Sequence, residues 1–432
     1  MSLLKLIDVG IFALILASLW SLDTIAGAGT NPLEIVRYGL ICGIELMIVG
    51  LAVIEIMRRP VSLRLSAGGA LLLVFFLYTL ISVAWSAGGA QSLLKDLLLA
   101  LTLAAAVAIA ALRPPRVLVE AAVLGCGIFV VLGFLAVIFA PGIGIETGWG
   151  LAGKWRGISV QKNTFGSLAA LSLVYGAIQL AVPPASGLRR RGLTLLAWVW
   201  SAFLLVCLVM SGSRGAQLAT VLGLVALGLS RLGRGRQNVV LFALALLLVP
   251  LSVLAAITFS ADATHLSILG LSFDTSSRTD LWGYGLANFD GRELFGFGPS
   301  GFWTPERLEV FRANNGWALD NFHSGYVTVL IEGGIVGAVL LVAALIGCFS
   351  VLRRRATGGD REAVFTFAFF AISIAENLIE NVLGRSTDFL FMLFLLLMLA
   401  GNAIRRPASE PAPAHTRDLP IPPSAYPEPS HG

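Results

Sequence analysis

Long apolar runs, each of about 20 residues, recur along the chain and are separated by short polar connections. A run of this length crosses the hydrocarbon core of a bilayer as one helix, in which every backbone hydrogen bond is satisfied internally. Of the 432 residues, 57% are hydrophobic and 13% are charged, and the mean hydropathy is +0.86. These values exclude an ordinary soluble globular protein. The sequence therefore predicts an all-α polytopic membrane protein.

We count twelve such runs and expect each to form one transmembrane helix of a domain that covers residues 1–404. The sequence SGSRG at 211–215 separates the seventh run from the eighth and could form a tight hairpin or a break within one longer element. The runs cover residues 8–22, 34–57, 67–86, 92–112, 117–140, 163–182, 193–212, 214–230, 238–259, 322–351, 362–383 and 386–404.

Arginines mark every second connection, which is the pattern expected of cytoplasmic loops. This alternation holds only if SGSRG crosses to the other side of the membrane, and it places both termini in the cytoplasm. The first 29 residues also resemble a secretory signal, but the alternation favours a first transmembrane helix. Residues 405–432 are proline-rich, without apolar periodicity, and are expected to be a disordered cytoplasmic tail.

The longest connection, residues 260–321, is expected to form a large extracytoplasmic loop with a functional role. Helical spacing predicts short interfacial helices at 276–289 and 305–315, with a glycine-rich turn at 295–302 between them. The glycines of that turn do not indicate a nucleotide site, because no strand precedes them and no Gly-Lys-Ser/Thr sequence follows. No nucleic-acid partner is expected.

Several basic residues lie on the extracytoplasmic side, against the usual bias. Such a residue is costly near a membrane unless it is paired or solvated, and a guanidinium group suits phosphate oxygens. Each could instead pair with an acid of the bundle, such as Glu332, Glu376, Glu380 or Asp388, but as a cluster they predict an anion site. These residues are Lys154, Arg156, Lys162, Arg214, Arg278, Arg292, Arg307, Arg312 and Arg385.

His323 stands where the polar loop meets the tenth apolar run, in the sequence DNFHSGYVTVLIEGG (320–334), at the membrane level of Arg214 and Lys162. An imidazole there could act as a general base or could be a satisfied interfacial side chain. Glu332 follows about 14 Å deeper along a helix, too far to orient the imidazole. We read Glu332 and Glu376 as structural partners of buried donors.

Six segments resemble the superfamily of O-antigen ligases and polysaccharide polymerases, over most of residues 150–400. The segment around His323 is the most specific of them, whereas residues 1–150 match only as a series of spans. The segments are VQKNTFGSLAALSL (160–173), SGSRGAQLATVLGLV (211–225), SSRTDLW (276–282), LFGFGPSGFW (294–303), NFHSGYVTVLIEGGIVGAVLLV (321–342) and ENVLGRSTDFLF (380–391).

The resemblance implies a metal-independent glycosyltransferase of the bacterial inner membrane, with its active site facing the periplasm. Such enzymes move a glycan from undecaprenyl diphosphate to a sugar hydroxyl. By resemblance, Arg214 and Arg278 would hold the diphosphate, and His323 would deprotonate or orient the acceptor hydroxyl. Further substrate-binding residues would be Lys154, Arg156, Lys162, Asn321, Glu380 and Arg385.

No cofactor is expected, and no metal. Asp23 stands alone in the first outer loop, where other lipid-linked transferases carry an acidic pair, and the four cysteines lie inside apolar runs. Fixed guanidinium groups can stabilise a departing diphosphate instead. The acceptor stays open between lipid A–core, for a ligase, and a second lipid-linked repeat, for a polymerase; the segments favour the polymerase, which could have a chain-length regulator as partner. A secondary transporter is the alternative of another class, although no repeat relates the two halves.

Overall fold

The computed structural model describes most of the chain. The described residues are 2–19, 32–59, 61, 63–148, 151–181, 188–240, 265–268, 271–274, 276–317, 320–383 and 388–404. Arg385, the predicted tail and all but the first residues of the predicted span 238–259 lie outside them.

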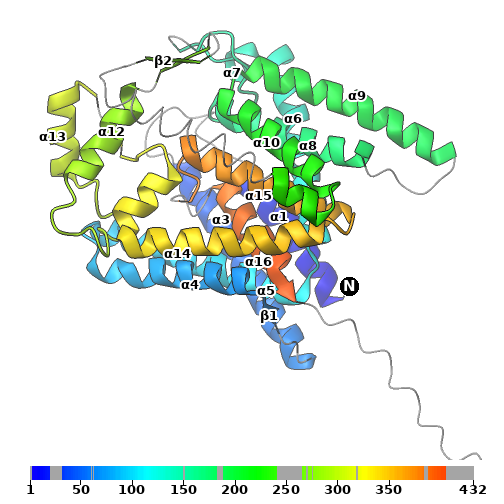
Figure 1. Ribbon diagram of the computed structural model, residues 1–432, viewed down its shortest axis with the longest axis horizontal. Coiled ribbons are helices and arrows are strands. Elements are labelled where there is room, and N and C mark those ends of the chain that lie inside the picture. The colour runs from blue at the N-terminus through cyan, green and yellow to red at the C-terminus, as the bar shows by residue number, and fades with distance from the viewer. Residues whose placement is uncertain are drawn as a thin grey trace, which may run out of the picture.

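Helices dominate the described part of the chain (Figure 1). Their bounds are α1 Leu3–Leu19, α3 Pro32–Arg58, α4 Ala67–Ser82, the 3₁₀ turn η1 Val83–Trp85, α5 Gly89–Leu112, α6 Pro115–Phe139, α7 Pro141–Gly144, α8 Lys162–Ala181, α9 Leu188–Ser211, α10 Arg214–Ser230, α12 Ser276–Ala287, α13 Pro305–Asn315, α14 Gly325–Ala356, α15 Arg361–Ile379 and α16 Phe389–Asn402. Strands β1 Arg64–Leu65 and β4 Ala403–Ile404 pair antiparallel, as do β2 His265–Ile268 and β3 Leu271–Asp274.

Seven helices of the described segments are long and apolar enough to cross a membrane, namely α3, α4 with η1, α5, α6, α8, α9 and α14. Two shorter helices, α10 and α16, are also apolar. These helices confirm the prediction of an all-α polytopic membrane protein. The count of twelve transmembrane helices stays a prediction. SGSRG separates two helices, because α9 ends at Ser211 and Ser213 caps the start of α10.

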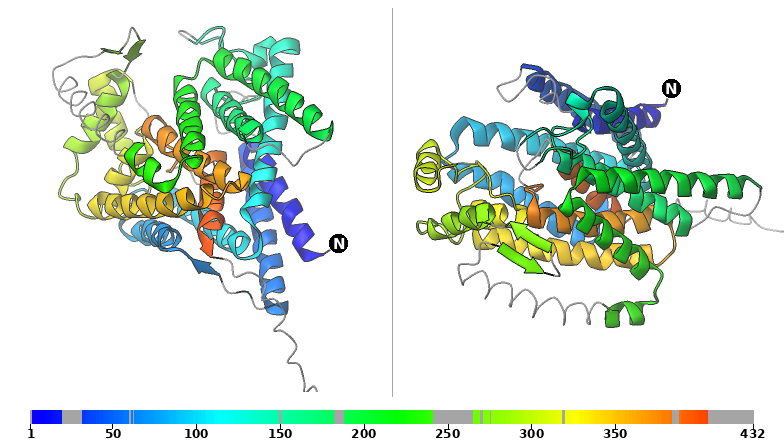
Figure 2. Two further views of the ribbon diagram at one scale, coloured as in Figure 1. Left: turned by 45° about the vertical axis from the view of Figure 1, so that its right-hand side comes forward. Right: turned by 90° about the horizontal axis from the view of Figure 1, so that it is seen from above.

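Helix α16 forms the centre of the bundle. Nearly every one of its side chains is buried, and it contacts α5, α6, α14 and α15 (Figures 1 and 2). A helix that is apolar on all sides suits this position. Its 14 residues rise about 21 Å, less than the bilayer core, but its neighbours rather than lipid surround it.

Helices α4 and α14 run side by side along much of their length (Figure 1). Glycines allow this close approach: a Cβ on Gly68 of α4 would lie only 2.3 Å from the carbonyl carbon of Gly347. Backbones approach most closely at such small residues in membrane helices. The two helices are therefore tightly packed in the part of α14 that follows residue 334.

A break divides α14 into a leading segment, residues 325–333, and a longer segment, residues 335–356. Gly334 has φ 64° and ψ −168° at the break. The loop before α13 satisfies the freed backbone groups. Ile335 and Val336 donate N–H groups to the carbonyls of residues 293 and 294, while the carbonyls of residues 331 and 332 accept from the N–H groups of residues 297 and 298.

Tyr78 of α4 also stabilises the break, because its hydroxyl donates a hydrogen bond to the Gly333 carbonyl at 2.6 Å. Irregular backbone within a membrane protein is tolerated where protein surrounds it in this way. The glycine-rich turn predicted at 295–302 is therefore part of the support of α14. This role was not apparent from the sequence, in which residues 322–351 read as one continuous run.

We expect Gly334→Ala to destabilise the fold. Its backbone lies in a region that only glycine occupies readily, at a cost of about 1–3 kcal/mol for other residues. In addition, the new Cβ would lie 2.5 Å from the Gly296 nitrogen. A lower midpoint of thermal unfolding in detergent checks this. Gly43→Ala in α3 is the control, since a Cβ there meets nothing within 4 Å and should leave the midpoint unchanged or raise it.

The predicted helices of the long loop are present as α12 and α13, at one end of the molecule (Figures 1 and 2). Thr304 caps α13 by accepting from the Arg307 N–H, and Gly316 ends it with φ 75°. A second hydrophobic cluster, containing Phe297, Phe302, Phe311 and Phe322, packs these helices against the leading segment of α14. The β2–β3 hairpin in this loop was not predicted.

Candidate functional site

Five segments that are far apart in the sequence meet around His323. They are the loop residues 144–148 and 151–157, the start of α8, the turn between α9 and α10, residues 320–324, and the end of α15. Backbone hydrogen bonds join them: the Trp155 N–H donates to the Met210 carbonyl, and the Gly325 N–H donates to the Glu380 carbonyl. The predicted residues Lys154, Lys162, Arg214, Asn321, His323 and Glu380 all lie on these segments.

His323 has an unusual backbone, with φ 47°. The Asn321 side chain supports this turn by accepting a hydrogen bond from the His323 N–H at 3.0 Å, and Ser324 then caps α14. A histidine at positive φ is uncommon and marks a position worth examining for function. The turn directs the chain so that the imidazole stands at the start of the leading segment.

Glu380 is the charged partner of His323 in this structure. Nδ1 of His323 lies 3.7 Å from Oε2 of Glu380, and both side chains are largely buried. This distance exceeds that of a hydrogen bond, so Nδ1 has no hydrogen-bond partner among the described residues. Asn163 in turn holds the carboxylate, donating from Nδ2 to Oε1 at 3.0 Å. The pair therefore forms a histidine–carboxylate–amide series.

A group of cations lies beside this series. The Lys162 ammonium donates to the Gly212 carbonyl at 3.2 Å, and the charges of Lys154, Arg214 and Glu380 all act on it. The Lys154 side chain crosses Gly212, where a Cβ would lie 2.6 Å from its Cδ. Gly212 has φ 60°, so the tight turn requires glycine.

Two helix N-termini point into the same region. Lys162 begins α8 and Arg214 begins α10, and the two helices touch where Gly166 packs against Ser213 and Ala216. The N-terminal end of a helix carries a partial positive charge and free N–H groups, which favour a phosphate. Helix ends and side-chain cations therefore bring positive charge to this corner, where the Glu146 carboxylate accepts from the Lys162 N–H at 3.1 Å. The anion site stays a prediction.

Two of the arginines predicted to be extracytoplasmic are engaged by their own loops. Arg156 donates to the Ile143 carbonyl at 2.8 Å and pairs with Glu146 at 3.9 Å. Arg307 pairs with Asp290 at 2.5 Å and stacks on Phe297 and Phe302. Their acidic partners are loop residues, not the bundle acids considered from the sequence. A substrate-binding role for Arg156 stays a prediction.

Arg278 lies on α12, one turn before Trp282 and on the same helical face. Trp282 donates from its indole to the Phe322 carbonyl at 2.7 Å, next to His323. Helix α12 is therefore fixed to the segment that carries the histidine. Arg385 lies outside the described residues.

The bundle acids Glu332 and Glu376 have the structural contacts predicted for them. Glu332 accepts from the Ser300 N–H at 3.0 Å, and Glu376 accepts from the Ser167 hydroxyl at 2.7 Å. Sequence reasoning missed Asn163 and the pairing of Glu380 with His323. Asn163 directly follows Lys162 in the sequence VQKN (160–163), so a polar side chain next to a predicted site residue was the available signal.

Fold and site together define a polytopic helical membrane protein with a cationic corner and a histidine–carboxylate pair at one end of the bundle. Residues 199–342 match the family model described as O-antigen ligase. The match covers one third of the chain and includes Arg214, Arg278 and His323, and it confirms the resemblance seen in the sequence. It supports a role in membrane glycan transfer during O-antigen assembly. No curated protein matches the chain.

Proposed function

We propose that the protein is a glycosyltransferase of the bacterial inner membrane that moves a glycan from undecaprenyl diphosphate to a sugar hydroxyl at the periplasmic face. The observation that carries this proposal is the position of the His323–Glu380 pair beside the cationic corner of Lys154, Lys162 and Arg214. Asn163, which holds Glu380, directly follows Lys162 in the chain, so the base and the proposed anion site are adjacent, as this transfer requires.

The cationic corner would bind the diphosphate of the donor lipid. As the bond between the anomeric carbon and the diphosphate oxygen breaks, negative charge grows on the leaving group. Arg214 and Lys162, together with the N-termini of α8 and α10, would stabilise that charge, and Arg278 would approach from α12. Preorganised donors of this kind supply much of the rate enhancement in many enzymes.

His323 would take the proton of the acceptor hydroxyl as its oxygen attacks the anomeric carbon. Glu380 would stabilise the imidazolium that results and fix the orientation of the ring, and Asn163 would hold Glu380. Asn321 would act through the backbone turn it supports. The proton leaves with His323, and the electron pair of the broken bond leaves with the diphosphate, so the step is balanced.

Purified protein in liposomes tests the proposal. With a labelled glycan on undecaprenyl diphosphate and a sugar acceptor, we expect release of undecaprenyl diphosphate and transfer of label to the acceptor, with and without a chelator of divalent cations. Release that requires a divalent cation would contradict the metal-independent chemistry. Solute uptake without glycan transfer would instead support a transporter.

We favour a polymerase, which joins one lipid-linked repeat to another, over a ligase that uses lipid A–core. The basis is the similarity of the VQKN and SSRTDLW segments to the polymerase branch. Expression in strains lacking one activity or the other distinguishes the two. A restored ladder of chain lengths supports the polymerase, and restored attachment to lipid A–core supports the ligase.

We expect Glu380→Gln to slow transfer roughly tenfold, equivalent to about 1.4 kcal/mol in the barrier, because the imidazolium loses its negative partner. The double variant with His323→Asn should be no slower than His323→Asn alone, since the carboxylate acts through the imidazole. Glu376→Gln is the control: that carboxylate faces Ser167, so its loss should not change the rate. Additive effects in the double variant would contradict the assignment.

A further inference from the structure

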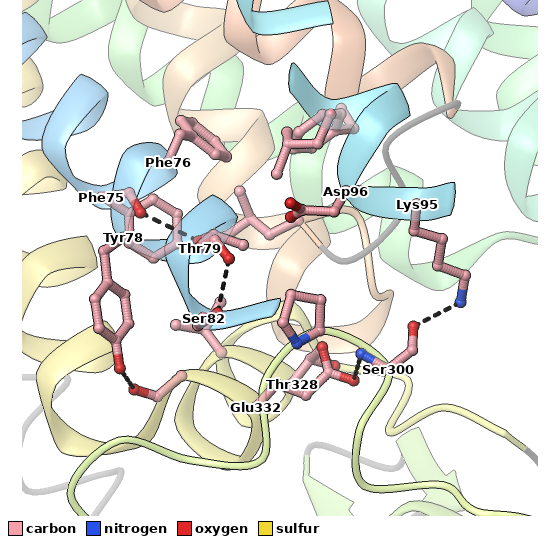
Figure 3. Close-up of a pocket in the computed structure, with 16 residues that line it drawn as sticks. Phe75, Phe76, Tyr78, Thr79, Ser82, Lys95, Asp96, Ser300, Thr328 and Glu332 are labelled. Atoms are coloured by element: carbon pink, nitrogen blue, oxygen red, sulfur yellow. Dashed lines mark hydrogen bonds between the residues drawn. The ribbon is translucent and has the colours of Figure 1, made fainter. Parts of the chain in front are cut away.

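A cavity of about 80 Å³ lies on the side of the leading segment of α14 that faces α4 and α5 (Figure 3). The His323–Glu380 pair faces α8 and α15 instead. Loop residues 299 and 300 cover the cavity, and the hydroxyls of Ser86 and Ser92 fix this loop by donating to the Pro299 carbonyl. Its space corresponds to roughly five water molecules or more, and it has no role in the chemistry described so far.

The polar atoms that line the cavity are mostly hydrogen-bond acceptors. Thr79, Ser82 and Thr328 each donate their hydroxyl proton to a carbonyl of their own helix, which leaves oxygen lone pairs free. Asp96 and Glu332 add two carboxyl groups (Figure 3). The cavity therefore offers acceptors to a ligand that brings hydrogen-bond donors.

Asp96 has a carboxylate oxygen that lacks a hydrogen-bond donor among the described residues. Its Oδ1 atom is buried and has no hydrogen-bond partner within the described part of the chain. Lys95, the neighbouring cation, is directed away from it and donates to the Ser300 hydroxyl at 2.9 Å (Figure 3). A buried oxygen of this kind costs free energy unless a partner arrives.

The remaining lining is apolar and aromatic, including the rings of Phe75, Phe76 and Tyr78. Pockets for small polar ligands combine such surfaces with a few convergent polar groups. A sugar ring fits this combination, since its C–H face is apolar and its hydroxyl edge donates hydrogen bonds. An anion fits less well, because two carboxyl groups face the space and the lining cation, Lys95, is engaged with the Ser300 hydroxyl.

We propose that this cavity is a carbohydrate subsite that holds one neutral or amino sugar unit of a substrate glycan, with Asp96 and Glu332 accepting from its hydroxyl or ammonium groups. The inference rests on the proposed function for the identity of the glycan. Thr328, which lines the cavity, lies in the first turn of α14, and His323 directly precedes that helix, so the base and the cavity lie at the same end of α14. The subsite would then select against uronic acids at this position.

Binding of free sugars to the full-length protein in lipid nanodiscs tests this inference without requiring transfer. The probes are methyl glucoside, glucosamine and glucuronate, observed by saturation-transfer NMR. We expect the first two to bind and glucuronate not to bind. Asp96→Asn, which keeps the size of the side chain, should weaken methyl glucoside roughly tenfold through loss of one charge-assisted hydrogen bond and should remove any preference for glucosamine.

His323→Asn is the matched control, because it should abolish transfer and leave sugar binding unchanged. If Asp96→Asn does not fold, Thr79→Val replaces it, since valine keeps the branched shape of threonine without the oxygen. Absence of methyl glucoside binding, equal binding by glucuronate, or unchanged binding in the folded variants would overturn the subsite. The proposed function would survive each of these results if the liposome assay still shows transfer.

Discussion

Replacement of His323 should reduce glycan transfer by roughly 10²- to 10⁴-fold, the range that a general base contributes. The informative variant is His323→Asn. Asparagine tolerates the left-handed backbone of this position, where φ is 47°, better than alanine does, so the variant removes the imidazole with little added strain. Initial rates of undecaprenyl diphosphate release in liposomes give the measurement.

Thermal unfolding shows whether the slower transfer by His323→Asn comes from the lost imidazole or from a loss of folded protein. His323→Asn and the parent protein should unfold at similar temperatures in detergent, while His323→Ala should unfold somewhat lower because of its backbone. A rate for His323→Asn above about a tenth of the parent rate would exclude the histidine as the base, since it corresponds to less than about 1.4 kcal/mol.

Arg214→Ala should lower the rate by about 10²- to 10³-fold, as expected when one fixed donor to developing charge is lost. The side chain is exposed at the first residue of α10, so the effect on stability should be small. Arg214→Lys should recover only part of the rate, because an ammonium group cannot form the paired bonds of a guanidinium group with phosphate.

Arg312→Ala is the control for charge alone. Arg312 is also exposed, in the last turn of α13. Its loss should change the rate less than about twofold if the effect of Arg214 is local, because α13 is not among the segments that meet around His323. Equal losses in the two variants would point to general electrostatic attraction of the donor and not to a bound diphosphate.

The sequence predicts most helices of this fold because their signals are local. Apolar runs of membrane length indicated the spans, and helical spacing indicated α12 and α13. The break at Gly334 could not be predicted, because the apolar run continues through it. The loop at 293–298 and the hydroxyl of Tyr78, both brought there by the tertiary fold, satisfy the backbone groups that the break leaves free.

The sequence pointed to candidate site residues but not to their pairing. Cations and a histidine at a membrane boundary are visible in the sequence, and five of them lie on the segments that meet, namely Lys154, Arg156, Lys162, Arg214 and His323. The pairing of His323 with Glu380 is a contact across 57 positions, and no pattern in one sequence reports it. The cavity does have a signal in the sequence, because Lys95 and Asp96 are charged residues within an apolar run and such residues often mark functional sites.

The break in α14 has a consequence for inhibition. His323 borders one end of the leading segment and Glu332 lies near the other, so one short segment carries the base at one end and a wall of the cavity at the other. A small compound lodged against Glu332 would occupy the proposed sugar subsite. It would compete with the glycan part of a lipid-linked substrate and not with its diphosphate, which would set it apart from mimics of the leaving group.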